Sequence, residues 1–168
     1  MANNFDTAFQ KTLMYEGWLS NDKNDRGGLT KFGISKASYP NIDIANLTLA
    51  QAKAIYQRDF WNPIKCDQIK NQDIAMQLFD IAVNCGTGGA GQIVQKAINS
   101  LLPAGQAISV DGIIGEITIA KINSLDAKVL NNRIATYRAR RYAQICVKNP
   151  SQVCFLEGWL VRTFGFII

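Results

Sequence analysis

The chain has 168 residues, of which 48% are hydrophobic and 18% charged, and its formal net charge is +5. This length is enough for one compact domain, or two small packed lobes, with a real core. The sequence contains no histidine, which excludes Ser-His-Asp and Cys-His nucleophilic sites and the usual histidine-based zinc sites of hydrolases. Carboxylate chemistry is not excluded, and we expect no metal and no cofactor.

The N-terminal segment predicts a helix that ends at a carboxylate. Asn4 is a suitable N-cap, and apolar residues recur at helical spacing over 5–13 before Glu16. Gly17 is typical of a helix end. Because Glu16 shares a face with residues that must be buried, desolvation would raise its pKa towards the range of a general acid. The alternative is a solvated glutamate at a frayed helix end.

A polar, glycine-containing loop follows this helix. It carries Asp22 and Asp25, and then Thr30 just before a short hairpin that we expect around 31–34. Cleavage of a glycosidic bond requires an acid that is kept protonated and an ionised carboxylate opposite it. The sequence therefore predicts a half-buried acid, Glu16, that faces a loop with a second acid and a hydroxyl.

The run from Glu16 to Ile34 also resembles a known signature. It is similar to the Glu-Gly-Gly-Tyr … Asp-Pro-Gly-Gly-x-Thr-x-Tyr/Phe-Gly-Ile motif of glycoside hydrolase family 108, the bacterial and phage N-acetylmuramidases, and to the Glu–Asp–Thr arrangement of phage-type lysozymes. The resemblance implies that Glu16 is the catalytic acid, Asp25 the second carboxylate, and Thr30 the hydroxyl that positions the attacking water. Arg26 replaces the proline of the motif.

The next two segments supply further candidates. Thr48 and Gln51 form a capping box that begins a helix through Phe60. Trp61 is the last residue of a segment that resembles the family's segment near the sugar cleft. It therefore either stacks on a sugar ring or belongs to the core.

Residues 71–84 predict a central helix that is buried on most sides. Asp80 and Asn84 lie one turn apart on it, and they either line a polar cleft wall or bond within the fold. The candidate substrate-binding residues are Asp22, Lys31, Phe32, Trp61, Asp80 and Asn84.

The second half of the chain is also helical by its periodicity. We expect a glycine-rich loop at 86–89, without the lysine of a phosphate-binding loop, and then helices at 90–101 and 126–148. The stretch 111–118 resembles the Asp-Gly-x-x-Gly-x-x-Thr turn of peptidoglycan-binding modules. Turn geometry alone explains its residue types, so it is either a structural turn or a binding site.

Two features of this half involve arginines. Arg138, Arg140 and Arg141 form a basic cluster, which is either a solvated face or a contact with an anionic wall polymer. Near the C-terminus, a phrase that resembles the family's closing Gly-Trp-x-x-Arg contains Arg162. This arginine pairs either with a carboxylate of the core or with one of the cleft. Ser151 is a candidate N-cap for the last helix.

Together these patterns predict a mainly α protein with a short β-hairpin or loop after the first helix, and the resemblance implies a lysozyme-like fold. We expect residues 1–88 to form a catalytic half and residues 89–168 a peptidoglycan-binding-like helical half, or both to form one compact domain. The resemblance further implies hydrolysis of the β-1,4 bond between N-acetylmuramic acid and N-acetylglucosamine in the peptidoglycan glycan strand. By analogy with phage-type lysozymes the reaction would be inverting.

Three other functions stay open: a lytic transglycosylase, a wall peptidase, and a non-catalytic wall-binding protein. The positive charge would draw the chain to an anionic surface, whereas no nucleic-acid motif and no membrane span is present. We expect a monomer with thiols rather than disulfides at Cys66, Cys85, Cys146 and Cys154. The N-terminus lacks the features of a secretory signal, so we expect synthesis in the cytoplasm and delivery to the wall through a pore or dedicated export.

Overall fold

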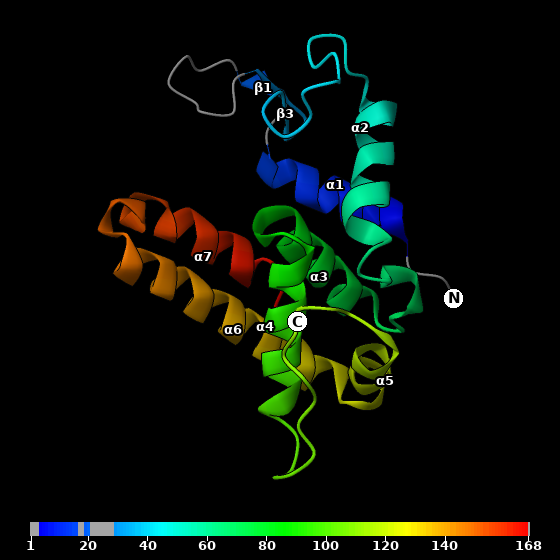
Figure 1. The fold of residues 1–168 in the computed structure, drawn as a ribbon, viewed down its shortest axis with the longest axis vertical. Helices are drawn as coiled ribbons and strands as arrows, with labels where there is room; N and C mark the ends of the chain where they lie inside the picture. Colours follow the sequence, from blue (N-terminus) through cyan, green and yellow to red (C-terminus); the bar gives the residue numbers. More distant parts are fainter. Residues whose placement is uncertain (1–3, 17–18, 21–28, 168) are drawn as a thin grey trace.

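The computed structural model describes residues 4–16, 19–20 and 29–167. In this described part the protein is mainly α, with a small antiparallel sheet near the N-terminus (Figure 1), so the predicted fold class is confirmed. The α-helices are α1 (Phe5–Glu16), α2 (Leu49–Tyr56), α3 (Gln72–Cys85), α4 (Thr87–Asn99), α5 (Glu116–Ser124), α6 (Ala127–Lys148) and α7 (Leu156–Phe164).

Helix α1 begins and ends where the sequence predicts. The Asn4 side chain caps it, because its Oδ1 accepts a hydrogen bond from the Thr7 N–H at 3.3 Å. The Asn4 N–H donates to Oε1 of Gln72 at 2.7 Å, which ties the start of α1 to the start of α3. The apolar face of α1 is buried, and the helix ends at Glu16. The predicted C-terminal role of Gly17 lies outside the described residues.

The sheet consists of β1 (Leu19–Ser20), β2 (Thr30–Lys31) and β3 (Ile34–Ser35), paired antiparallel in that order. Phe32 and Gly33 connect β2 and β3 with φ angles of 53° and 75°. Two successive residues with positive φ are typical of the type I′ turn, whose twist matches that of the flanking strands. The hairpin predicted at 31–34 is therefore confirmed.

Helix α2 begins with the predicted capping box. The Gln51 N–H donates to Oγ1 of Thr48 at 3.3 Å, and the Thr48 N–H donates to Oε1 of Gln51 at 2.8 Å. The helix continues as a π-helical turn, Gln57–Trp61, and a 3₁₀ helix, Cys66–Gln68, leads on towards α3.

Helix α3 is the central helix, in contact with α1, α4 and α6. The expected loop at 86–89 is wrong beyond Gly86, because α4 begins at Thr87. Gly86 alone separates the helices, with φ of 77°. Helix α4 passes very close to the 111–115 turn, where a β-carbon on Gly91 would overlap the carbonyl oxygen of Gly112. Only glycine fits at position 91 without a shift of backbone.

Helices α6 and α7 pack against each other, joined by a 3₁₀ helix, Pro150–Phe155. Ser151 does not cap α7, because the 3₁₀ helix runs directly into it at Phe155. The chain then packs back on the core: Phe166 is buried, and Nδ2 of Asn131 donates to its carbonyl at 2.7 Å. All four cysteines are free thiols. In the described part of the chain no helix is long and apolar enough to cross a membrane.

Candidate active site

The C-terminal end of α1 lies against α7. The Tyr15 ring centroid is 6.2 Å from that of Phe166, and Cζ of Arg162 is 5.2 Å from the Tyr15 ring centroid. Glu16 is the next and last residue of α1. Its side chain, Asp22 and Asp25 lie outside the described residues, so the predicted roles of these three carboxylates stay predictions.

Thr30 is the one member of the predicted catalytic set whose surroundings are described. It lies in the central strand β2, half-buried, and pairs with Ser20 of β1 and Ser35 of β3. Strand β1 begins three residues after Glu16. The sheet therefore places Thr30 beside the segment that leaves the end of α1.

The two hairpin residues predicted as substrate contacts are bonded within the protein. Nζ of Lys31 donates to the carbonyl of Ala45 at 3.0 Å. The Phe32 side chain is buried, and its carbonyl accepts a hydrogen bond from the Tyr56 hydroxyl at 3.0 Å. A buried ring offers no face to a sugar, so we correct the prediction for Phe32. Both residues anchor the hairpin to the rest of the fold.

Trp61 lies in the core, with none of its surface exposed. Its ring packs at 5.3 Å from Phe5 and 5.6 Å from Phe79, centroid to centroid, and its Nε1 donates to Oδ1 of Asp67 at 3.0 Å. The structure supports the core interpretation and corrects the stacking prediction. The reason is that the π-helical turn containing Trp61 packs directly against α3.

Asp80 and Arg138 are also fully buried and form an ion pair, with Nη2 of Arg138 at 2.7 Å from Oδ2. Arg162 completes the cluster, with Nη2 at 2.8 Å from Oδ1. The carboxylate that Arg162 pairs with is thus in the core. Because buried charges require partners, we correct two predictions: Asp80 does not line an open cleft, and Arg138 does not belong to the exposed basic cluster.

Asn84 marks the surface end of this network. Its Oδ1 accepts a hydrogen bond from the Tyr142 hydroxyl at 2.7 Å, and that hydroxyl accepts from Nε of Arg138 at 3.0 Å. Burial is the main cause that raises the pKa of Tyr142 to about 12. Asn84 is exposed and remains a candidate substrate contact. The sequence does not reveal the role of the Tyr142 hydroxyl, because periodicity indicates only that its ring points inward.

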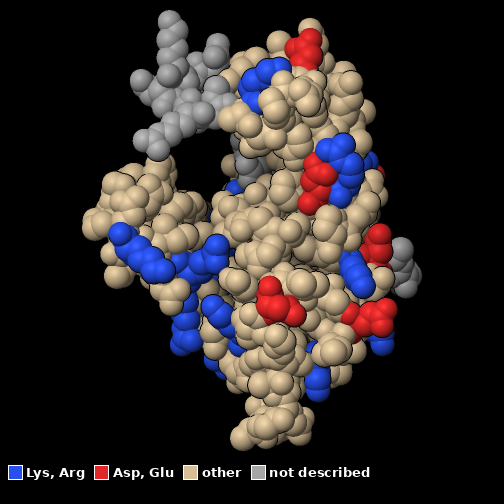
Figure 2. Space-filling view, in the orientation of Figure 1, with Lys and Arg blue, Asp and Glu red and all other residues tan. Residues whose placement is uncertain are grey.

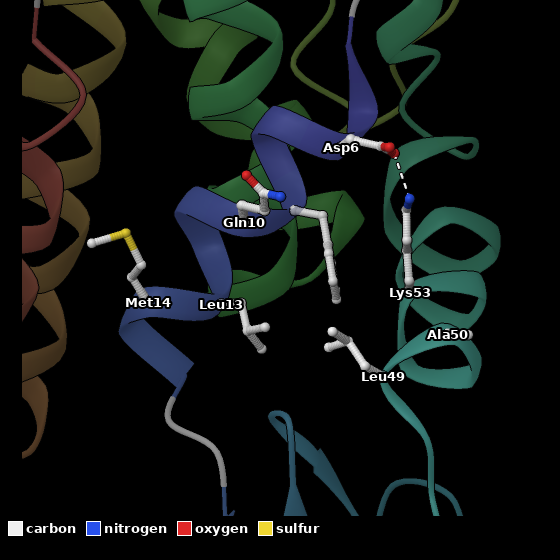
Figure 3. Close-up of a pocket in the computed structure, with 8 residues that line it drawn as sticks. Asp6, Gln10, Leu13, Met14, Leu49, Ala50 and Lys53 are labelled. Carbon is white, nitrogen blue, oxygen red and sulfur yellow. Dashed lines mark ion pairs between the residues drawn. The ribbon is translucent and has the colours of Figure 1, made fainter.

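Two concave features lie near α1. Figure 2 shows a hollow between the end of the molecule that carries the β-sheet and α2, and the end formed by α6 and α7; α1 ends beside it. A groove of about 640 Å³ lies between α1 and α2, where Leu13 and Leu49 point toward each other (Figure 3). Asp6 is the acidic residue among the described residues that line the groove. Its Oδ1 forms an ion pair with Nζ of Lys53 at 2.6 Å, which neutralises its charge. Among the described residues that line it, this groove therefore lacks the carboxylate pair that hydrolysis requires.

The 111–118 turn is held together by a buried glutamine. Nε2 of Gln95 donates to Oδ1 of Asp111 at 2.7 Å and to the carbonyl of Ile113 at 3.0 Å, while its Oε1 accepts from the Gly112 N–H at 2.8 Å. The Ile113 N–H, and then Gln95, lower the pKa of Asp111. These bonds support the structural interpretation of the motif.

No group of three or more potential metal ligands occurs in the described ranges. Residues 9–86 match the family model for glycosyl hydrolase 108, and residues 90–164 match the predicted peptidoglycan domain. The chain belongs to glycoside hydrolase family 108. This family 108 protein is a glycoside hydrolase, and the two matches together identify it as a peptidoglycan hydrolase.

The fold of this family 108 hydrolase also occurs in the solved structure of Brucella abortus SagA. The two proteins are 21% identical over 96% of this chain and 94% of that chain, with a TM-score of 0.71. At this identity the similarity shows the fold alone. No curated protein matches the sequence.

Proposed function

We propose that this family 108 hydrolase is an N-acetylmuramidase. It cleaves the β-1,4 bond between N-acetylmuramic acid and N-acetylglucosamine. The observation that carries the proposal is the connection of α1 to the sheet: α1 ends at Glu16, and the pairing of Ser20 with Thr30 sets the threonine beside the segment that follows. A carboxylic acid and a water-positioning hydroxyl thus come from adjacent parts of the chain.

In the proposed mechanism Glu16 gives its proton to the glycosidic oxygen as the bond to the anomeric carbon breaks. Asp25 stabilises the oxocarbenium-like transition state and takes a proton from a water molecule that Thr30 positions. The water oxygen then bonds to the anomeric carbon from the opposite face, which inverts its configuration. A separation of about 6.5–9.5 Å between the two carboxyl groups is expected for inversion, against about 5–5.5 Å for retention.

The reaction type is tested by mass spectrometry of the products that the wild-type protein releases from purified sacculi. We expect muropeptides with reducing N-acetylmuramic acid ends. Ends of the 1,6-anhydro type would instead identify a lytic transglycosylase, and fragments cut within the stem peptide would identify a peptidase. Binding to sacculi with no soluble fragment would mean that the chain is a wall-binding protein.

A further inference from the structure

A small basic pocket lies between α4 and α6, apart from α1 and the sheet. Its volume is about 150 Å³. Figure 2 shows Lys and Arg side chains gathered over the region of α6, whereas the acidic side chains of that view lie at its centre and right. The polar side chains that line the pocket are Gln92, Lys96, Tyr137, Arg140, Arg141 and Gln144.

The cations of this pocket have no acidic partner among the described residues. In the described chain, no acidic residue lines the pocket or forms an ion pair with Lys96, Arg140 or Arg141. Nε of Arg141 is buried and has no hydrogen-bond partner among the described residues. A buried charged donor without an acceptor is costly. An acceptor from outside the chain would remove that cost.

The start of α4 adds to the positive potential. A β-carbon built on Gly89 would lie 3.6 Å from Nη2 of Arg141, so this guanidinium lies against the first turn of α4. Gly86 provides no side-chain cap, and the helical hydrogen bonds begin with the Ala90 N–H donating to the Gly86 carbonyl at 3.0 Å. The positive end of the helix dipole therefore adds to the charge of Arg141, and together they favour an anion.

We propose that this pocket binds a carboxylate of the peptidoglycan stem peptide. Two guanidinium groups and an ammonium group match the geometry and charge of an oxyanion. Cζ of Arg140 lies 5.0 Å from the Tyr137 ring centroid, which orients one guanidinium. A volume of about 150 Å³ is well below the roughly 300 Å³ at which small-molecule sites begin. It accommodates a carboxylate rather than a sugar ring.

The choice of peptidoglycan rests on the proposed function and on the position of the pocket in the chain. All of its lining residues fall within residues 90–164, the segment that matches the predicted peptidoglycan domain. The stem peptides supply carboxylates along the glycan strand. The pocket thus gives the second half of the chain a contact with the peptide part of the polymer, separate from the bond that is cleaved.

Binding is measured by cosedimentation with purified sacculi in a Glu16→Gln background, so that the polymer is not consumed. The pocket variant is Arg140→Gln/Arg141→Gln. The control is Lys128→Gln/Lys148→Gln, which also removes two positive charges, but from exposed positions of the same helix. We expect the Kd of the pocket variant to rise about tenfold or more, and that of the control about twofold at most. Equal losses in the two variants would overturn the proposal.

The source of the anion is tested with modified sacculi. Conversion of the stem carboxyl groups to amides should weaken binding of the parent protein to the level of the pocket variant. Acid treatment, which removes any phosphate polymers attached to the sacculi, should leave binding of the parent protein unchanged. Binding that survives amidation, or that disappears with the phosphate polymers, would contradict the proposal.

Thermal midpoints establish that the variants are folded. Should the double variant unfold, two single variants at exposed positions give the same comparison: Lys96→Gln in the pocket and Lys128→Gln as the control. Weaker binding of Lys96→Gln than of Lys128→Gln supports the proposal. Equal binding of the two variants to sacculi overturns it. Because all the compared proteins share the Glu16→Gln change, a difference in binding between them does not report the catalytic role of Glu16. Pocket-dependent binding by a protein that releases no reducing ends would contradict the proposed function but not this inference.

Discussion

Arg162 binds both carboxylate oxygens of Asp80, 82 residues away in the chain, through Nε at 2.9 Å and Nη2 at 2.8 Å. The same arginine lies over the ring of Tyr15, next to Glu16. One buried ion pair thus joins α3 and α7, and its arginine contacts the end of α1, whose last residue is the proposed acid. The position of the candidate site depends on this junction.

Loss of the Asp80 charge should therefore be severe. Asp80→Asn removes the counter-charge of Arg138, which is fully buried, and removing one partner of a buried pair costs about 3–5 kcal/mol. The free energy of unfolding from urea titration measures this loss. Asp73→Asn in the first turn of the same helix, where no ion pair forms among the described residues, should cost under about 1 kcal/mol. Similar losses in the two variants would contradict the structural role of Asp80.

The contact between α4 and the 111–115 turn predicts a steric effect at Gly91. Gly91→Ala places a methyl group on the Gly112 carbonyl, so we expect destabilisation by about 1–3 kcal/mol, as in other overpacked sites. Gly88→Ala is the matched control in the same helix, because nothing lies within 4 Å of its added β-carbon. Thermal melting compares the two. A Gly91→Ala protein as stable as the Gly88→Ala protein would mean that the close approach is wrong.

Tyr142 predicts a loss of stability at alkaline pH. Its pKa is raised from 10.0 to about 12, so the folded protein binds the phenolic proton more tightly than the unfolded chain does. The contribution of this difference to the free energy of unfolding is at most about 3 kcal/mol. It is fully present below about pH 10 and is lost as the pH rises to about 12.

Urea titrations of the wild type and Tyr142→Phe over this range measure the effect. We expect the stability of the wild type, relative to the variant, to be constant up to about pH 9 and to fall between about pH 10 and 12. Parallel curves through the alkaline range would show that the tyrosine titrates alike in the folded and unfolded protein.

Local features of the fold could be predicted from sequence because their causes are local. The cap of Asn4, the capping box of Thr48 with Gln51, and the hairpin at 31–34 each depend on residues within a few positions of one another. The helical repeat also located α3 and α6 closely, because these helices bury most of one face.

The errors concern pairings between distant segments. Arg138 meets Asp80 across 58 residues, and in the sequence it is indistinguishable from its exposed neighbours Arg140 and Arg141. The Trp61 ring faces inward because the π-helical turn packs on α3, which helical periodicity does not predict. The sequence pattern predicts too late a start for α4 because glycines usually end helices, whereas here Gly88 and Gly89 lie in the first turn of α4.

The measurement that tests the central claim most directly is the rate at which reducing ends are released from sacculi by Glu16→Gln. Glu157→Gln, a matched change at an exposed position of α7, is the control, and thermal midpoints confirm that both proteins are folded. Without a general acid we expect the rate of the folded Glu16→Gln protein to fall by about 10²–10⁴-fold, while Glu157→Gln retains the wild-type rate. A folded Glu16→Gln protein that releases reducing ends as fast as the wild type would contradict the assignment of Glu16 as the catalytic acid.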